Sequence, residues 1–297
     1  MSSFVNRKFL SDSFRLLYKF GVGHAFRRFY DLLRVKIYER KRNKRFHRLL
    51  ASTPKHVVKK VLDFQMELDL NDFGIHRDLF LDGIREPIAT AHLKSLLNPD
   101  SVVLEVGANI GYYVLMESKI CRKIYAIEPV RQNIQNLKRN LAINKCKNIE
   151  VYELALGDKN GTLSINISSK SNLHSFYPHS GTVAHQQVEM LTGDDFIKNK
   201  EAPTFVRMDV EGYELNIIRG MAQTLKRVNN IFMEIHSDIM SLPETRELID
   251  LLHQAGFQPE LIVKYDRPGL SKLMPMKQIK NIYRGDAGGY EVFWKKA

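Results

Sequence analysis

The segment from Val102 to Gly111, which reads VVLEVGANIG, constrains the fold of this chain more than any other. It begins with three apolar residues, as does a parallel strand that is buried on both faces of a sheet. Gly107 and Gly111 follow the strand, and glycines in that place let a ligand approach the backbone closely. We therefore expect a strand, a glycine loop and a helix, with a ligand bound outside the carboxyl end of the strand.

A second strand end points to the kind of ligand. The apolar run Ile124–Ile127 ends at Glu128, seventeen residues after Gly111. An acid in this place can accept hydrogen bonds from the two hydroxyls of a ribose. Together, the glycine loop and the acid predict a nucleoside cofactor.

The glycine spacing separates two classes of cofactor. Nicotinamide sites normally carry Gly-x-Gly-x-x-Gly, because a pyrophosphate sits on the helix amino terminus, whereas Asn109 replaces the second glycine here. Glu105 would oppose a pyrophosphate and would suit a cation, such as the methionine ammonium of S-adenosylmethionine. Glu128 does not discriminate, since both classes use this acid. The loop therefore favours the methyl donor, and the alternative is an ordinary strand–turn–helix without a ligand.

Strands and helices alternate along most of the chain, which predicts an α/β fold with a doubly wound, mostly parallel sheet. Further strands are expected at 149–154, 204–208, 231–236, 258–264 and 289–294, and helices at 111–121, 130–144, 213–227 and 244–255. The alternating pattern within 160–190 predicts an antiparallel insertion, and 168–182 reads as a loop. Residues 52–98 are expected to form a mostly helical lead-in.

Polar clusters follow five of the expected strands. They are Glu105–Gly111, Glu128, Ala155–Asp158, Asp209–Gly212 and Glu234–His236. Ligands of such sheets bind outside the carboxyl ends of the strands, so we expect these clusters to meet at one edge. Their convergence argues for a ligand site more strongly than any one motif does.

Positive charge is concentrated in the first fifty residues. They contain fourteen Lys and Arg against three acids, whereas the remaining residues contain 31 against 30. Phe26, Phe29, Tyr30, Leu33 and Ile37 share one face of an expected helix. A basic helix with such a face can lie on an anionic membrane surface or track nucleic-acid phosphates. Alternatively, its apolar face packs on its own domain.

Composition indicates an enzyme-sized protein of a reducing compartment. A chain of 297 residues can hold one large α/β domain and an extension. Its two cysteines have no metal-type spacing and suggest no disulfide framework. We find neither the roughly 18 apolar residues needed to span a bilayer nor the apolar core of a signal peptide. We therefore expect a cytoplasmic protein, peripheral at the membrane if the basic head binds lipid.

Five motifs resemble the FkbM-type family of S-adenosylmethionine-dependent methyltransferases, across roughly residues 75–240. They are Glu105-Val-Gly-Ala-Asn-Ile-Gly111, Ala126-Ile-Glu-Pro129 with Asn133 and Asn140, Ala155-Leu-Gly-Asp158, Arg207-Met-Asp-Val-Glu-Gly-Tyr-Glu214 and Met233-Glu-Ile-His236. Many family members begin the first motif with Asp, and Glu105 keeps the carboxylate. The first fifty residues have no counterpart in the family pattern.

The resemblance implies a class I, Rossmann-like methyltransferase fold, with a seven-stranded sheet covered by helices on both faces. On this basis we expect three parts. Residues 1–50 form a basic amphipathic helical extension, 51–98 a helical lead-in or cap, and 99–297 the S-adenosylmethionine-binding domain.

The resemblance also implies methyl transfer to a hydroxyl, most specifically on a glycan, a glycolipid or a similar natural product. The expected cofactor residues are Glu105, Gly107, Asn109, Gly111, Glu128, Pro129, Ala155 and Asp158. Two alternatives stay open. One is an RNA methyltransferase with a basic head. The argument against it is that we find no aromatic–proline tetrapeptide after the fourth strand, where it could hold a flipped base. The other is an inactive cofactor-binding module. The complete set of carboxylates at the strand ends argues against it.

A hydroxyl acceptor needs its proton removed, which makes Asp209, Glu211 and His236 the expected catalytic residues. His236 is the best base by intrinsic pKa. Asp209 and Glu211 are alternatives, and with Glu234 they could instead form a magnesium site. The competing interpretation is that the two acids cap the following helix and that His236 is a structural histidine. The loop residues His174 and His179 are weaker candidates on the substrate side.

Overall fold

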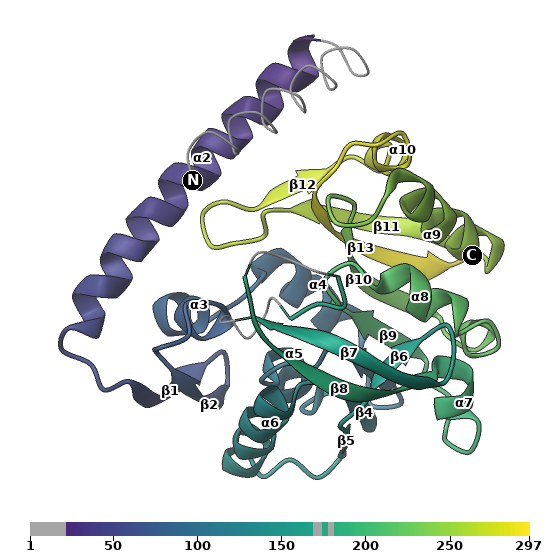
Figure 1. Cartoon of the computed structure of the whole chain (residues 1–297), viewed down its shortest axis with the longest axis horizontal. Helices are drawn as coiled ribbons and strands as arrows, with labels where there is room; N and C mark the ends of the chain where they lie inside the picture. Colours follow the sequence, from purple (N-terminus) through teal and green to yellow (C-terminus); the bar gives the residue numbers. More distant parts are fainter. Residues whose placement is uncertain (1–21, 169–173, 178–180) are drawn as a thin grey trace. The chain divides into compact units, whose positions relative to one another are not determined.

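The computed structural model describes residues 22–168, 174–177 and 181–297. The chain divides into two compact units, Met1–Thr53 and Pro54–Ala297. The described part of the first unit consists mainly of one long helix, α2 (Val22–Leu50), drawn in purple in Figure 1. Within the described residues, no helix combines the length and apolarity needed to cross a membrane.

The second unit begins with a β-hairpin. Its first elements are β1 (His56–Val61), β2 (Phe64–Asp69), α3 (Ile75–Asp82) and α4 (Pro87–Leu96). The prediction of a mostly helical lead-in is therefore wrong for the hairpin. Phe64, Met66 and Leu68 are buried and alternate with more exposed polar residues, which is the period of a half-buried strand.

An eight-stranded sheet forms the centre of this unit, in the order β12-β11-β13-β10-β9-β3-β4-β5. The strands are β3 (Val102–Val106), β4 (Lys123–Ile127), β5 (Ile149–Tyr152), β9 (Phe205–Met208), β10 (Asn230–His236), β11 (Phe257–Lys264), β12 (Lys272–Met274) and β13 (Gly289–Lys296). The five strands from β10 to β5 are parallel, and β13 pairs antiparallel with both β10 and β11. The mostly parallel α/β sheet is confirmed, and the short β12 is added at one edge to the seven predicted strands.

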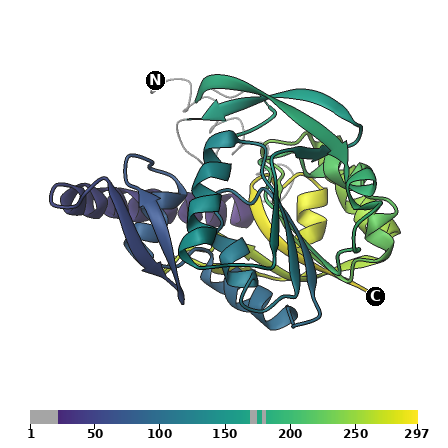
Figure 2. The ribbon, with the colours of Figure 1, turned by 90° about the horizontal axis from the view of Figure 1, so that it is seen from below.

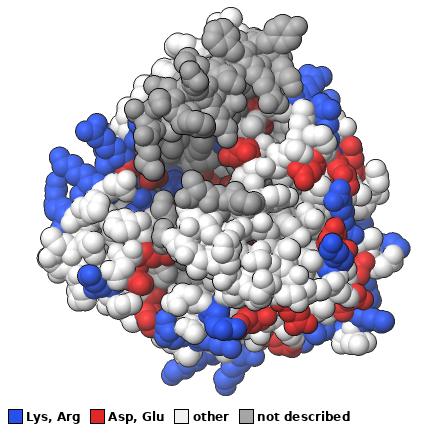
Figure 3. Space-filling model, viewed as in Figure 1, with Lys and Arg blue, Asp and Glu red and all other residues white. Residues whose placement is uncertain are grey.

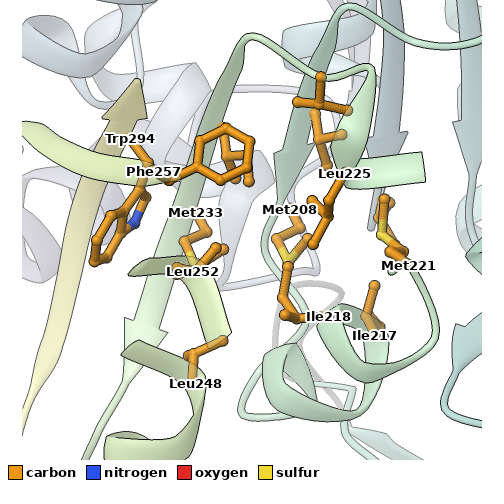
Figure 4. Packing of buried hydrophobic residues seen from close by; sticks show 14 of the residues in the cluster. Met208, Ile217, Ile218, Met221, Leu225, Met233, Leu248, Leu252, Phe257 and Trp294 are labelled. Atoms are coloured by element: carbon orange, nitrogen blue, oxygen red, sulfur yellow. The ribbon is translucent and has the colours of Figure 1, made fainter. Parts of the chain in front are cut away.

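Helices cover both faces of the sheet (Figure 2). They are α5 (Tyr112–Glu117), α6 (Arg131–Ile143), α7 (Gly193–Ile197), α8 (Glu214–Arg219), α9 (Leu242–Gln254) and α10 (Gln278–Tyr283), with a 3-10 turn at Thr224–Lys226. On one face, Met208, Met233 and Trp294 pack with residues of α8 and α9 (Figure 4). On the other face, the ring of Phe232 lies 5.8 Å from that of Tyr113 in α5.

Side chains along β3 point alternately to the two faces of the main sheet. Val102, Leu104 and Val106 belong to the core that includes α8 and α9, so Val103 and Glu105 point to the opposite face. All five residues are buried. A strand that is covered on both sides must be apolar nearly throughout, and the single acid within it therefore needs a buried partner.

A second, three-stranded sheet lies outside the main one. It contains β6 (Ala155–Gly157), β7 (Gly161–Ser168) and β8 (Thr182–Thr192) in the order β6-β8-β7. Strands β7 and β8 are antiparallel, as predicted for residues 160–190, and form a separate ribbon in Figure 1. Strand β6 begins three residues after the end of β5 but pairs with β8, so Ala155 belongs to the three-stranded sheet and Asp158 directly follows β6.

Candidate functional site

A pocket lies at the carboxyl ends of β3, β4 and β9. The loops that follow these three strands contribute Asn109, Glu128, Asp209 and Glu211 to its lining, as expected for a doubly wound sheet. Of the predicted site residues, its lining includes Glu105, Gly107, Asn109, Glu128, Pro129, Asp209 and Glu211.

The glycine loop after β3 has an unusual backbone conformation. Gly107, Asn109 and Gly111 all have positive φ angles, of +85°, +50° and +94°. A Cβ atom on Gly107 would overlap the backbone carbonyl oxygen of Asp209. The loops after β3 and β9 therefore touch at a point that only glycine can occupy.

Glu128 joins the glycine loop to the loop after β4. One carboxylate oxygen accepts a hydrogen bond from the backbone N–H of Asn109 at 2.8 Å. The other accepts from the backbone N–H of Val130 at 3.0 Å and from the amide of Asn133 at 3.3 Å. Burial raises the pKa of Glu128 to about 7. The acid thus organises the pocket wall and also presents its carboxyl group to a ligand.

Glu105 has a protein partner of its own. Its side chain is fully buried, and Arg207 donates a hydrogen bond to it at 2.9 Å. Arg207 also reaches the carboxylate of Asp209 at 3.3 Å and lies 4.2 Å from the centre of the Tyr113 ring. Burial raises the pKa of Glu105 to about 7, although Arg207 opposes this shift. Glu105 therefore lines the pocket as half of a buried ion pair and not as a free anion.

His236, at the end of β10, lies among carboxylates. Its Nδ1 atom is 2.7 Å from Glu214, and its Nε2 atom is 3.5 Å from Glu211 and 3.7 Å from Glu234. Burial alone would lower the pKa of His236, but Glu234 and Glu214 raise it well above its ordinary value. The surrounding carboxylates therefore favour the imidazolium form, which makes His236 a poorer proton acceptor than a free imidazole.

The two predicted acids differ in their electrostatic surroundings. Burial would raise the pKa of Asp209, but the cations Arg207 and His236 hold it below its usual range. Burial raises the pKa of Glu211 to about 8, with His236 opposing the shift. Glu211 also has a left-handed φ angle of +51°, a strained conformation that often marks functional residues. Asp209 and Glu211 line the pocket, whereas His236 is not part of the lining and contacts Glu211.

Three of these side chains are close enough to share a metal ion. Asp209, Glu234 and His236 each offer a ligand atom, and these atoms lie within 4.8 Å of one another. Two carboxylates and an imidazole suit a divalent cation. A histidine binds a metal ion through a neutral imidazole nitrogen. A metal ion at this site would therefore have to displace a proton from His236.

Of the remaining predicted residues, Gly111, Ala155 and Asp158 are not part of the pocket lining. Gly111 caps α5 and leaves no room for a side chain beside Leu137. Ala155 is buried in β6, and Asp158 is exposed beyond it. His174 does line the pocket, and its Nδ1 accepts a hydrogen bond from the backbone N–H of Ser168. His179 lies outside the described residues.

Two cations of the site were not predicted to belong to it. Arg85 precedes α4 and lines the pocket, with its guanidinium 2.5 Å from Glu86 and 4.0 Å from Asp209. No motif surrounds it. Arg207 belongs to one of the family motifs. The sequence feature that could have identified it as a site residue is a lone arginine within the otherwise apolar strand Phe205–Met208.

The pocket lining contains more acidic groups than basic ones. Four carboxyl groups line it, from Glu105, Glu128, Asp209 and Glu211, against the guanidinium groups of Arg85 and Arg207. S-adenosylmethionine carries a sulfonium and an ammonium against one carboxylate, so its net charge is positive. A pyrophosphate cofactor would place two further negative charges beside these acids.

The fold and the pocket define a class I methyltransferase, and similarity to known proteins gives the family. Residues 105–259 match the methyltransferase FkbM domain. The chain belongs to this family, which confirms the resemblance seen in the sequence. Its cofactor is S-adenosylmethionine, which the glycine loop and Glu128 fit.

The chain is only distantly similar to relatives whose names give an activity. The chain is 25% identical over 166 residues to the hexuronic acid methyltransferase AglP of Haloferax volcanii, a match that covers 54% of this chain and 65% of the relative. It is 24% identical over 216 residues to the 2-O-methyltransferase NoeI of Sinorhizobium fredii, covering 63% and 86%. Among solved structures, an FkbM methyltransferase of Methylobacillus flagellatus matches with a TM-score of 0.39 and 20% identity, over 65% of this chain and 43% of that one.

Glu128→Gln is expected to weaken binding of S-adenosylmethionine by about 1.5–3 kcal/mol, the size of a hydrogen bond to a charged group. The amide replaces one of the two carboxylate oxygens, of which one holds Asn109 of the glycine loop and the other holds Val130, and it removes the charge expected to accept hydrogen bonds from a ribose. Calorimetry with the purified protein measures the change. Glu189→Gln is the matched control, because the same chemical change occurs at an exposed residue outside the pocket lining. Equal effects of the two variants would contradict the placement of the cofactor.

Proposed function

We propose that this protein is an O-methyltransferase that modifies a hydroxyl on the sugar of a glycan, a glycolipid or a similar natural product. The observation that carries the proposal is Glu211, whose partly buried carboxyl group lines the pocket and has its pKa raised to about 8. A base with a pKa near the working pH is what removal of a hydroxyl proton requires. The names of two relatives, a hexuronic acid methyltransferase and a 2-O-methyltransferase, support a sugar acceptor.

The charges of the site indicate a different role in methyl transfer for each residue. S-adenosylmethionine, when bound, supplies an activated methyl group. The carboxylate of Glu211 accepts the proton of the acceptor hydroxyl as the oxygen becomes nucleophilic. The imidazolium of His236, held at Nδ1 by Glu214, stabilises ionised Glu211 from 3.5 Å away. Asp209 is a weaker base, because Arg207 and His236 keep its pKa low.

A metal-assisted reaction is the alternative at the same cluster. A divalent cation bound by Asp209, Glu234 and His236 would lower the pKa of a bound hydroxyl without a carboxylate base. Turnover that disappears with a chelator and returns with magnesium would favour this alternative. Turnover that is unchanged by the chelator would favour Glu211.

Methyl transfer from labelled S-adenosylmethionine into a fractionated cell extract tests the acceptor class. We expect label in the glycan or glycolipid fraction. Label in RNA would overturn the proposal in favour of an RNA methyltransferase. Binding of the donor without transfer to any fraction would indicate an inactive module.

Turnover is expected to rise about tenfold per pH unit up to about pH 8 and then to level off. Glu211 acts only when it is ionised, and burial raises its pKa to about 8, so each unit below that value leaves tenfold less of the active form. Steady-state kcat between pH 6 and 9 measures the profile, with donor binding measured at each pH as the control. A flat profile over this range would rule out Glu211 as the base.

A further inference from the structure

We infer that helix α2 docks the protein on a membrane surface that contains anionic lipids. The first observation is an exposed apolar face, which we call the α2 stripe: Phe26, Tyr30, Leu33 and Ile37. Their side chains are 72%, 55%, 45% and 48% exposed. Spacings of four, three and four residues place them on one side of the helix.

The stripe is not the buried face of its own helix. Phe46 is fully buried and Arg42 nearly so, with Arg42 donating a hydrogen bond to the hydroxyl of Tyr38 at 2.8 Å. At 100° per residue, Phe46 lies roughly 170° around the helix from the centre of the stripe. The helix therefore buries one face in its last turns and exposes an apolar face on the opposite side.

The second observation is charge. Residues 22–50 carry ten Lys and Arg against two acids. Lys41, Lys44 and Arg48 are exposed and continue the line of the stripe toward the end of the helix. The unit from Pro54 to Ala297 is nearly neutral, with 31 basic and 30 acidic residues. Both signs are interspersed over the face drawn in Figure 3. The positive charge is therefore a property of the first unit.

A lipid surface accounts for both observations at once. An amphipathic helix lies in the interface with its apolar side chains among the acyl chains and its Lys and Arg at the anionic headgroups. RNA phosphates would use the same cations but would leave the stripe in water. The described helices are not apolar enough to cross a bilayer, which agrees with a helix that lies in the interface. The inference does not depend on the acceptor proposed above.

Flotation of the full chain with vesicles tests the inference. We expect binding to vesicles of phosphatidylcholine with phosphatidylserine, weak binding to phosphatidylcholine alone, and loss of binding at high salt. The double variant Leu33→Gln with Ile37→Gln keeps every charge. It should bind at least about tenfold more weakly, since it removes two apolar side chains that enter the lipid on binding. The triple variant Lys41→Gln, Lys44→Gln, Arg48→Gln should lose the preference for the anionic vesicles.

The matched control is Val58→Gln with Leu273→Gln, which changes two exposed apolar residues of the other unit, at 58% and 59% exposure. It should bind vesicles like the unchanged protein. Calorimetry with S-adenosylmethionine shows that the unit Pro54–Ala297 is folded in each variant, and circular dichroism shows that the helix content is kept. The calorimetry also separates a failure of this inference from a failure of the methyltransferase assignment. Vesicle binding that the stripe variant retains in full would overturn the inference. Salt-sensitive binding of single-stranded RNA without vesicle binding would overturn it as well.

Discussion

Replacement of Glu211 by glutamine is expected to lower kcat about 10²–10⁴-fold, the usual cost of losing a general base, while the affinity for S-adenosylmethionine changes little. Glutamine keeps the shape of the side chain and its place in the pocket lining, but it cannot take up a proton. The residual turnover should no longer rise with pH toward pH 8, because the group responsible for that rise is gone.

Two further variants make this expectation specific. Glu189→Gln applies the same chemical change to an exposed residue of β8 and should leave turnover unchanged. His236→Asn removes the cation that lowers the pKa of Glu211, so its pH profile should move to higher pH while turnover at high pH largely persists. If His236→Asn abolishes turnover and Glu211→Gln does not, the original expectation that His236 is the base is right and our assignment is wrong.

Replacement of Gly107 by alanine is expected to abolish measurable binding of S-adenosylmethionine and to lower the free energy of unfolding by about 2–5 kcal/mol. Two costs combine. The φ angle of +85° is strained for any residue with a Cβ atom, and that atom would overlap the carbonyl oxygen of Asp209. The loops after β3 and β9 must then separate, and together they form the pocket.

Gly269→Ala isolates the first of these costs. Gly269 has a similar φ angle of +79°, but an added Cβ atom would meet no other atom within 4 Å. We expect it to lose only about 1–2 kcal/mol and to keep donor binding. Thermal unfolding and calorimetry on both variants measure the difference. Normal donor binding by Gly107→Ala would show that the contact between the two loops does not shape the cofactor site.

The sheet could be predicted from the sequence because its strands are nearly continuous apolar runs that end at polar clusters. β3, with Glu105 as its only acid, is the clearest case. The same logic placed Asp209 and Glu128 at the pocket. It did not reveal that residues 155–157 form a short strand that pairs with β8 in a second sheet, because an apolar run followed by a polar cluster looks the same in either sheet.

The electrostatics of the site could not be predicted in this way. His236 looked like the best base because its intrinsic pKa is near neutrality, but Glu214 and Glu234 raise that pKa well above this range. Arg85 reaches the pocket from a segment with no motif, far from Asp209 in the sequence. Such partners come from tertiary packing, which brings together residues that no local pattern connects.

The position of the transferred methyl group tests the central claim most directly. A methyl glycoside of a hexuronic acid offers both hydroxyl groups and a carboxylate, and a carboxylate would need no base to accept a methyl group. The protein is incubated with this acceptor and labelled S-adenosylmethionine, and the product is examined by mass spectrometry and NMR before and after alkali. We predict a base-stable methyl ether that the unchanged protein forms and Glu211→Gln does not. A base-labile methyl ester, formed equally well by both proteins, would contradict the account.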